Sequence, residues 1–276
     1  MNEKKKIVIW CGNAANQRAL ANKIAQRFDL RGIVIDKKTG LKKLPFIKRL
    51  LAALQDRIFF SRIIHSWVSL QKEYAHQYPE WPKVPVIETG SINSDDAYHF
   101  TQKLSPDIIV VSGTGLVRSK MLSLKPGIGI INLHTGLSPY IRGGPNCTNW
   151  CIATGQYNKI GNTIMWINEG IDSGNIIASE CTALHEIKSL DNIQWEVMEH
   201  AHELYLRAID YLSVTPAPYN SVPQKQIAEG QLYLTKMWNF SAKRKLLNNL
   251  PVFIKNGIKT KDRSIVTVGL KNTNAG

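Results

Sequence analysis

The sequence predicts an α/β protein: a Rossmann-like, mostly parallel sheet with helices on both faces, followed by a short C-terminal appendage. Short and almost fully apolar runs recur along the chain, as expected of strands that are buried on both faces. Segments with apolar residues at helical spacing separate these runs. The length of 276 residues suits one large domain with a full hydrophobic core.

The first predicted elements form a strand–helix–strand unit. Apolar runs at residues 6–10 and 30–35 are typical of buried parallel strands, and residues 17–28 between them are predicted to be helical. The turn before this helix contains Gly12 and Asn13. Backbone N–H groups at such a helix start can bind an anion, such as a phosphate of a substrate. A plain strand-to-helix turn is an equally good interpretation, so both stay open.

Residues 37–82 form an unusually long connection, which we interpret as a helical insertion. Lysines and arginines are concentrated in residues 37–49, and apolar residues within 46–78 recur near helical spacing, which predicts one or two amphipathic helices. Three roles are open: a cover on the sheet with solvated lysines, a lid over an anionic substrate, or a basic amphipathic contact with a membrane. We expect the cover, and no membrane partner.

The rest of the sheet is predicted from the middle of the chain. Further strands are expected at residues 84–87, 106–112, 129–133, 161–167 and 176–180, the last two antiparallel. Helices are expected to begin at Ser94, to continue over 149–154, and to span 190–213. We therefore expect one domain over residues 1–213 and a short basic region over 214–276.

Positive charge is concentrated at both ends of the chain. The formal net charge is +14: residues 1–62 contribute +11, residues 63–223 contribute −5, and residues 224–276 contribute +8. Such an asymmetry indicates an anionic partner, for example a nucleotide diphosphate, RNA or an acidic membrane surface. A basic protein without such a partner is the other interpretation.

Several classes of protein are disfavoured. No apolar run reaches the ~18 residues that a membrane-spanning helix needs. The basic N-terminus leads into a strand rather than into the apolar core of a signal peptide. The four cysteines are scattered, without a Cys-x-x-Cys pair, which favours structural thiols in a reducing compartment over a metal site. We expect a cytoplasmic protein without a bound metal.

The residues that carry chemistry begin at Asn132 and His134. They lie two apart after an apolar run, so their side chains share one face of a strand and emerge at its carboxyl end, where open α/β sheets place their sites. About one βα unit later, Asp172 lies in Gly-Ile-Asp-Ser-Gly. Acyl transfer to an amine needs an amide to bind an oxyanion, an imidazole to move a proton and a carboxylate to orient it. Each residue alone is also an ordinary turn or core residue.

The ordered set of motif residues resembles the formyltransferase family that uses 10-formyltetrahydrofolate. The resemblance covers about residues 5–210 and rests on Asn132, His134, Pro139, Arg142, Gly143, Asp172 and Gly174. The family includes glycinamide ribonucleotide formyltransferase, methionyl-tRNA formyltransferase and the sugar N-formyltransferases. The resemblance implies that residues 1–213 form the formyltransferase domain and that Asn132, His134 and Asp172 are catalytic.

The resemblance also implies binding residues, with 10-formyltetrahydrofolate as co-substrate and no metal. Those expected near the folate are Gly113, Thr114, Gly115, Leu116, Val117, Gly170 and Ile171. Those expected near the acceptor are Gly12, Asn13, Pro139, Arg142 and Gly143, with Arg142 either contacting the acceptor or bracing its own loop. The segment Gly136-Leu-Ser-Pro139 replaces the Ser-Leu-Leu-Pro of many relatives, so this chain departs from the family on the acceptor side.

The acceptor separates the candidate functions. We expect a nucleotide-linked amino sugar, such as a dTDP-4-amino-4,6-dideoxy sugar, used for surface polysaccharide or O antigen of lipopolysaccharide. Residues 214–276 are too few for the barrel of roughly a hundred residues that resembling tRNA formyltransferases carry, and the lysines of 37–49 suit a diphosphate. The alternatives are methionyl-tRNA formyltransferase and a folate-binding, non-catalytic relative. Nucleic acid is not expected, and a homodimer is left open.

Overall fold

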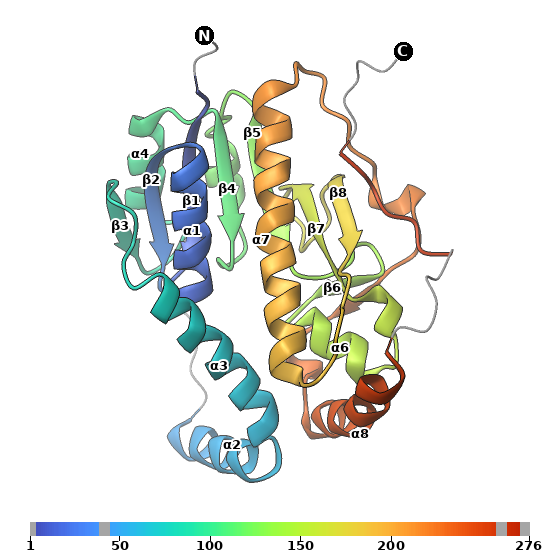
Figure 1. Cartoon of the computed structure of the whole chain (residues 1–276). Helices are drawn as coiled ribbons and strands as arrows, with labels where there is room; N and C mark the ends of the chain where they lie inside the picture. Colours follow the sequence, from blue (N-terminus) through green and yellow to red (C-terminus); the bar gives the residue numbers. More distant parts are fainter. Residues whose placement is uncertain (1–3, 39–44, 258–263, 271–276) are drawn as a thin grey trace.

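The computed structural model describes residues 4–38, 45–257 and 264–270. Its central feature is a seven-stranded sheet in the order β3-β2-β1-β4-β5-β7-β8 (Figure 1). The strands are β1 Lys6–Gly12, β2 Asp29–Asp36, β3 Val86–Thr89, β4 Ile108–Ser112, β5 Gly129–His134, β7 Gly161–Trp166 and β8 Ile176–Cys181. Neighbours from β3 to β5 are parallel, whereas β7 is antiparallel to both β5 and β8. The predicted fold class is confirmed.

Helices cover both faces of this sheet because its strands alternate between two cores. Ile7 and Ile9 of β1 contribute to a core with helices α1 (Ala15–Arg27) and α7 (Leu190–Val214). Val8 and Trp10 point to the other face, toward the helices α4 (Asp95–Leu104) and α5 (Ser119–Leu122). Strands buried on both faces explain why their sequences are continuous apolar runs.

The insertion between β2 and β3 contains two helices, α2 (Phe46–Phe59) and α3 (Ser61–Gln77). Helix α3 packs on α1 and α7 and buries Leu70 and Tyr74, whose hydroxyl donates a 2.7 Å hydrogen bond to Glu199 of α7. Helix α3 therefore lies on two helices, α1 and α7, rather than directly on the sheet, and α2 lies beyond it at the lower end of the molecule (Figure 1). No helix among the described residues is both long and apolar enough to cross a bilayer.

The C-terminal region is packed into the rest of the domain. Strand β9 (Gln231–Tyr233) pairs in parallel with β6 (Ile141–Gly143), which follows the catalytic motif in the chain. Helix α8 (Phe240–Asn256) packs against α6 (Cys147–Ala153) in a second core. Three short 3-10 helices, at Tyr157–Lys159, Gln224–Gln226 and Thr235–Met237, complete the described elements.

Four predicted element starts are off by two residues: α1 begins at Ala15 and β4 at Ile108, and the starts of β3 and α6 also differ. Strand β3 begins at Val86 rather than at residue 84, because Val84 N–H donates within the preceding turn to the carbonyl of Pro82 at 2.8 Å and Pro85 has no N–H to donate. Helix α6 begins at Cys147 rather than at residue 149, because the Asn146 side chain caps it by accepting from the N–H of Asn149. Caps of this kind are local polar contacts that apolar periodicity does not show.

Candidate active site

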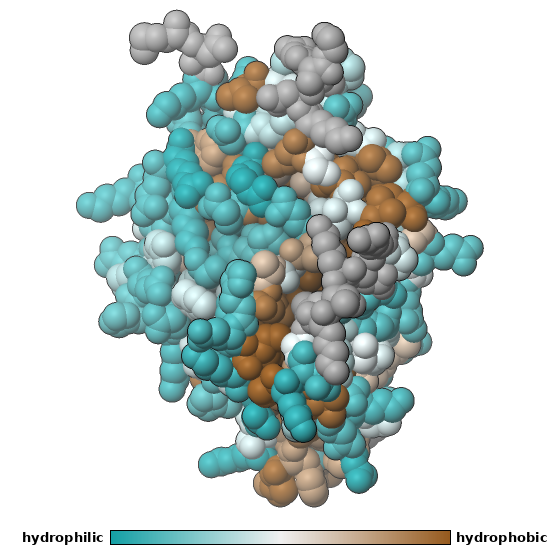
Figure 2. Space-filling model, turned by 45° about the vertical axis from the view of Figure 1, so that its right-hand side comes forward, coloured by the Kyte–Doolittle hydropathy of each residue, from teal (hydrophilic) through white to brown (hydrophobic). Residues whose placement is uncertain are grey.

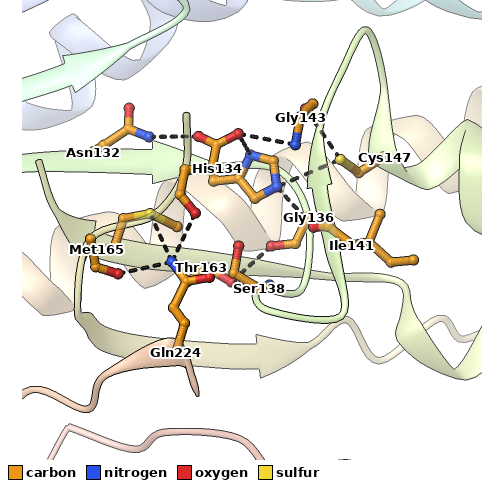
Figure 3. Close-up of polar contacts among 12 residues, drawn as sticks. Asn132, His134, Gly136, Ser138, Ile141, Gly143, Cys147, Thr163, Met165 and Gln224 are labelled. Atoms are coloured by element: carbon orange, nitrogen blue, oxygen red, sulfur yellow. Dashed lines mark hydrogen bonds and ion pairs between the residues drawn. The ribbon is translucent and has the colours of Figure 1, made fainter. Parts of the chain in front are cut away.

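Asn132 and His134 occupy alternate positions on β5. This strand is parallel to β4 on one side and antiparallel to β7 on the other. Strand β7 pairs beside them, with Met165 opposite Asn132 and Thr163 opposite His134. His134 is the last residue of β5, and 7 % of its surface is exposed. The side chains emerge together, as the two-residue spacing predicts. Figure 3 shows them on one side of the strand.

Asp172 comes from the loop between β7 and β8 and joins the two side chains. Its Oδ1 accepts from the Asn132 side-chain amide at 3.4 Å, and its Oδ2 lies 3.4 Å from Nδ1 of His134. The same Oδ2 accepts from the backbone N–H of Gly143 at 3.1 Å. The structure therefore brings the three predicted catalytic residues into contact, with the carboxylate in the middle.

The surroundings of His134 favour its charged form. Its Nε2 lies 3.1 Å from the carbonyl oxygen of Ile141, so both ring nitrogens face oxygen acceptors. Burial on its own would lower the pKa of His134, but the Asp172 carboxylate, together with contacts to Cys147 and the Ile141 carbonyl, outweighs it and raises this pKa to about 10. Cys147 Sγ lies 3.6 Å from Nε2 on the side away from Asp172. His134 is thus an imidazolium at neutral pH.

Thr163 holds the loop that follows His134. Its hydroxyl donates to the carbonyl of Gly136 at 2.8 Å and accepts from the N–H of Ser138 at 2.9 Å. Thr163 is fully buried, and its strand position opposite His134 is fixed by the β5–β7 register. Two backbone groups of the loop are therefore satisfied by one side chain. Sequence reasoning missed this residue, because a threonine in an apolar strand gives no distinctive signal.

Gln224 holds the loop that carries Asp172. Its side-chain nitrogen donates 2.8 Å hydrogen bonds to the carbonyl oxygens of Asp172 and Gly174, and it reaches them from the C-terminal region (Figure 3). Asp172 has a φ of 45°, in the left-handed region that L residues rarely adopt. Contacts outside the loop therefore stabilise its conformation, and sequence reasoning did not identify Gln224.

These side chains open into a cavity of about 560 Å³. All seven residues expected near a folate line it, together with Asn132, His134 and Asp172. The turn over residues 113–115 is tethered from β2, because Asp36 accepts from the N–H of Gly115 at 2.8 Å. Lys38, from the lysine cluster that the sequence indicated for a diphosphate, also lines the cavity. Sequence reasoning missed other lining residues, which come from the insertion, α7 and the C-terminal region: Trp67, Gln194, Met198, Tyr233, Leu234 and Thr235.

The acceptor residues expected from the sequence are only partly at this cavity. Gly143 lines the cavity. Its φ is 87°, and a Cβ atom at this position would lie 2.1 Å from the carbonyl oxygen of Tyr233, so the site requires glycine. Pro139 and Arg142 are not among the lining residues.

Gly12 and Asn13 do not line the cavity either. The N–H groups of Ala15 and Asn16 at the start of α1 donate to the side chain of Gln71 on α3, at 2.7 and 3.4 Å. These backbone N–H groups, which the sequence indicated as a possible anion-binding site, are therefore hydrogen-bonded to a side chain of the insertion. Gly12 instead packs so closely on the carbonyl of Gly113 that a Cβ would lie 2.8 Å from it.

The predicted lysine cluster has different outcomes along its length. Lys37 pairs with Glu88 on β3, and Lys38 lines the cavity. Lys42 and Lys43 lie outside the described residues, as does the side chain of Lys48. Among the residues that the structure describes, no three histidine, cysteine, aspartate or glutamate side chains are grouped to hold a metal ion.

Comparison with known proteins identifies the family. The chain belongs to the formyl transferase family, whose model matches residues 71–209. A curated relative, the methionyl-tRNA formyltransferase of Syntrophus aciditrophicus, is 31% identical over 138 residues, or 50% of this chain and 44% of that protein. The chain spans about half the length of the curated relatives it matches.

Two solved structures share the fold. A sugar N-formyltransferase from a Shewanella species has a TM-score of 0.55 and 14% identity, covering 89% of this chain and 87% of its own. Glycinamide ribonucleotide transformylase 1 from Symbiobacterium toebii has a TM-score of 0.53 and 16% identity, covering 81% and 95%. At these identities the likeness concerns the fold alone.

Proposed function

We propose that the protein transfers a formyl group from 10-formyltetrahydrofolate to the primary amine of a nucleotide-linked amino sugar. The observation that carries the proposal is the Asp172 carboxylate, which contacts Asn132 and His134 at the wall of the cavity. An amide and an imidazolium that both contact one carboxylate supply the groups that formyl transfer to an amine requires. Membership of the formyl transferase family supports the same reaction.

The residues present fit a reduced folate. Backbone at 113–115 lines the cavity beside the apolar side chains of Leu116 and Val117, which suits a flat ring with polar edges. Gln17 adds a polar group to the same wall: its buried Oε1 has no hydrogen-bond partner among the described residues. A buried acceptor without a partner is costly unless a ligand or water satisfies it. The bound folate would supply the formyl group that is transferred.

His134 and Asn132 stabilise negative charge in this proposal. Because its pKa is raised, His134 is already protonated at neutral pH and acts as a hydrogen-bond donor to the oxygen of the reacting formyl group. Asn132 contributes its side-chain amide beside it. Asp172 keeps His134 charged and is the adjacent group that can accept the proton that the amine loses as its bond to the formyl carbon forms. This proton would pass to the folate nitrogen as the bond between that nitrogen and the formyl carbon breaks. The loss of one such donor typically lowers the rate ~10²–10³-fold.

The acceptor proposal rests on the C-terminal region. Tyr233, Leu234 and Thr235 line the cavity, so the catalytic unit extends beyond residues 1–213. The described residues after 214 form one three-residue strand, β9, that pairs with β6, and this arrangement is not a barrel. A relative of the same fold whose length this chain largely matches is described as a sugar N-formyltransferase. Lys38 at the cavity suits a phosphate of a nucleotide-linked sugar.

Methionyl-tRNA is the second candidate acceptor. The curated relatives that match the chain at 29–31% identity are methionyl-tRNA formyltransferases, and the net charge of +14 is compatible with RNA. The match covers only 44% of the first of these relatives and 48% of the second. More than half of each relative is therefore not matched, and the match gives no information on tRNA contacts made by those parts.

Alanine substitutions test the catalytic assignment. We expect His134→Ala and Asp172→Ala each to reduce formyl transfer at least ~10²-fold while folate binding, followed by fluorescence titration, stays measurable. His65→Ala is the matched control, since the His65 side chain is 72% exposed and does not line the cavity. Turnover within twofold of the unsubstituted protein in either active-site variant would remove the proposed roles.

A further inference from the structure

Helix α2 carries an apolar face that the protein does not bury. Besides Phe59 at its end, six of its apolar side chains are each exposed over more than half of their surface: Phe46, Ile47, Leu50, Leu51, Leu54 and Ile58. At about 100° per residue these positions fall within one arc of the helix. An amphipathic helix of a globular domain normally turns its apolar face inward. The outward-facing apolar side of α2 therefore indicates that a binding partner covers it.

The side of α2 opposite this apolar face is the one that contacts the rest of the protein. Asp56 lies about 200° around the helix from Leu54, and its carboxylate pairs with Lys243 of α8 at 2.6 Å. At the end of the helix, Phe59 packs edge-on against Phe240 of α8, with ring centroids 5.7 Å apart. These contacts fix which way α2 is turned. Figure 1 places α2 at the lower end of the molecule, where the space-filling view shows apolar surface (Figure 2).

The charge of the same segment identifies the partner. Residues 42–62 contain six lysines and arginines, and Asp56 is their only acidic residue. Asp56 is already paired with Lys243, so it does not offset this charge. Arg57 of α2 and Arg62 of α3 are both exposed. A surface that is both apolar and strongly cationic complements one that offers acyl chains and anionic groups together.

A second copy of the chain fits this surface poorly. In a symmetric pair the same patch meets itself, so two strongly positive segments would be brought together. Like charges at a contact disfavour association.

We propose that α2 is an interfacial helix that seats the protein on an anionic lipid bilayer, with its apolar face at the boundary between headgroups and acyl chains. The proposal is independent of the catalytic function. It changes the expectation from the sequence, which was no membrane partner. Helix α2 leads directly into α3, whose Trp67 lines the active-site cavity. A membrane-bound α2 would therefore be joined through a single residue, Phe60, to the helix that contributes Trp67 to the cavity wall.

Vesicle flotation with the full chain tests the proposal. We expect the protein to float with vesicles of equal parts phosphatidylcholine and phosphatidylglycerol, and to stay in solution with vesicles of phosphatidylcholine alone. Leu54→Asp places a charge in the apolar face and is expected to reduce flotation about tenfold or more. Raising salt from ~0.1 M to ~1 M should weaken binding, because it screens the attraction to anionic lipid.

Val214→Asp is the matched control. Val214 is 67% exposed at the end of α7, so the substitution adds the same charge to another exposed apolar residue of a helix, and flotation should not change. Circular dichroism and thermal unfolding confirm that both variants fold. Absence of flotation with the anionic vesicles, or equal flotation of Leu54→Asp and the unsubstituted protein, would overturn the proposal. A lipid-free dimer that Leu54→Asp converts to a monomer would assign the face to a second copy instead.

Discussion

The side-chain nitrogen of Gln224 donates hydrogen bonds of 2.8 Å to the carbonyl oxygens of Asp172 and Gly174. Gln224 lies beyond residues 71–209, the part that the family model matches. A residue of the C-terminal region thus fixes the loop that carries the central carboxylate of the site. Asp172 needs such support because its φ of 45° is strained for a residue with a side chain.

Gln224→Leu should therefore slow the reaction. Leucine keeps much of the side-chain volume but leaves two buried carbonyls without their donor, a loss of about 1–3 kcal/mol. If that loss displaces Asp172, we expect kcat to fall about tenfold or more. Steady-state kinetics measure the effect, with Gln226→Leu as the control, because Gln226 is exposed on the same 3-10 helix. An unchanged kcat in Gln224→Leu would show that the loop positions Asp172 without Gln224.

Asp172→Asn should lower the pKa of His134. Burial lowers this pKa and the Asp172 carboxylate raises it, with the net result of about 10. Without the carboxylate, burial dominates, and the ring should lose its proton well below pH 10. We therefore expect activity that needs the imidazolium to persist up to pH ~10 in the unsubstituted protein and to be lost at lower pH in the variant. NMR titration of labelled histidine, assigned with His134→Gln, measures the shift directly, and equal pKa values in the two proteins would contradict it.

The charge on His134 also makes the stability depend on pH. Its folded-state pKa of about 10 is above the unfolded value of 6.5, so its contribution is fully present below pH 6.5 and is lost as the pH rises through 10. We expect the difference in unfolding free energy between the unsubstituted protein and His134→Gln to shrink over this window. Denaturant unfolding at a series of pH values measures it. A difference that stays constant from pH 6 to pH ~10 would argue against a charged His134.

Thr163→Val should destabilise the protein more than its small change in shape suggests. Valine cannot accept from Ser138 N–H or donate to Gly136 C=O, both of which are buried contacts. An unsatisfied buried group costs about 1–3 kcal/mol, so the free energy of unfolding should fall by about that amount. Thr163→Ser keeps the hydroxyl and should recover most of the loss. A free energy of unfolding of Thr163→Val equal to that of the unsubstituted protein would contradict this role of the hydroxyl.

Lys38→Ala should affect binding rather than the chemical step. Lys38 lines the cavity as a point charge and has no role in the catalytic contacts, so we expect a raised KM for the anionic ligand it meets, with kcat retained. Separate titrations of acceptor and folate show which ligand that is. Lys83→Ala is the control, because Lys83 is exposed and does not line the cavity. An unchanged KM for both substrates would leave Lys38 as a solvated lysine.

The sheet and the catalytic contacts could be predicted because their signals are local. Each buried strand is a short apolar run, and Asn132 and His134 share a face through the two-residue period of one strand. Asp172 lies far along the chain, and the resemblance to the family linked it to the other two.

What the sequence did not show depends on contacts between distant segments. Gln71 satisfies the helix start near Gly12 and Asn13, and Gln224 reaches Asp172 from the C-terminal region. The orientation of α2 is set by the pair Asp56–Lys243, whose members are 187 residues apart. Apolar periodicity predicts that a helix has an apolar face, but only packing decides where that face points.

Formyl transfer to a panel of amines, read by mass spectrometry, tests the proposed function most directly. The panel contains nucleotide-linked amino sugars with dTDP, UDP and GDP, charged initiator tRNA and glycinamide ribonucleotide, each incubated with 10-formyltetrahydrofolate at ~150 mM salt to weaken nonspecific phosphate attraction. We predict that a nucleotide-linked amino sugar gains one formyl group, and that Asp172→Ala abolishes the gain. Efficient formylation of methionyl-tRNA with no sugar product would contradict the acceptor that we propose, and no formylated product with any amine would contradict the enzyme itself.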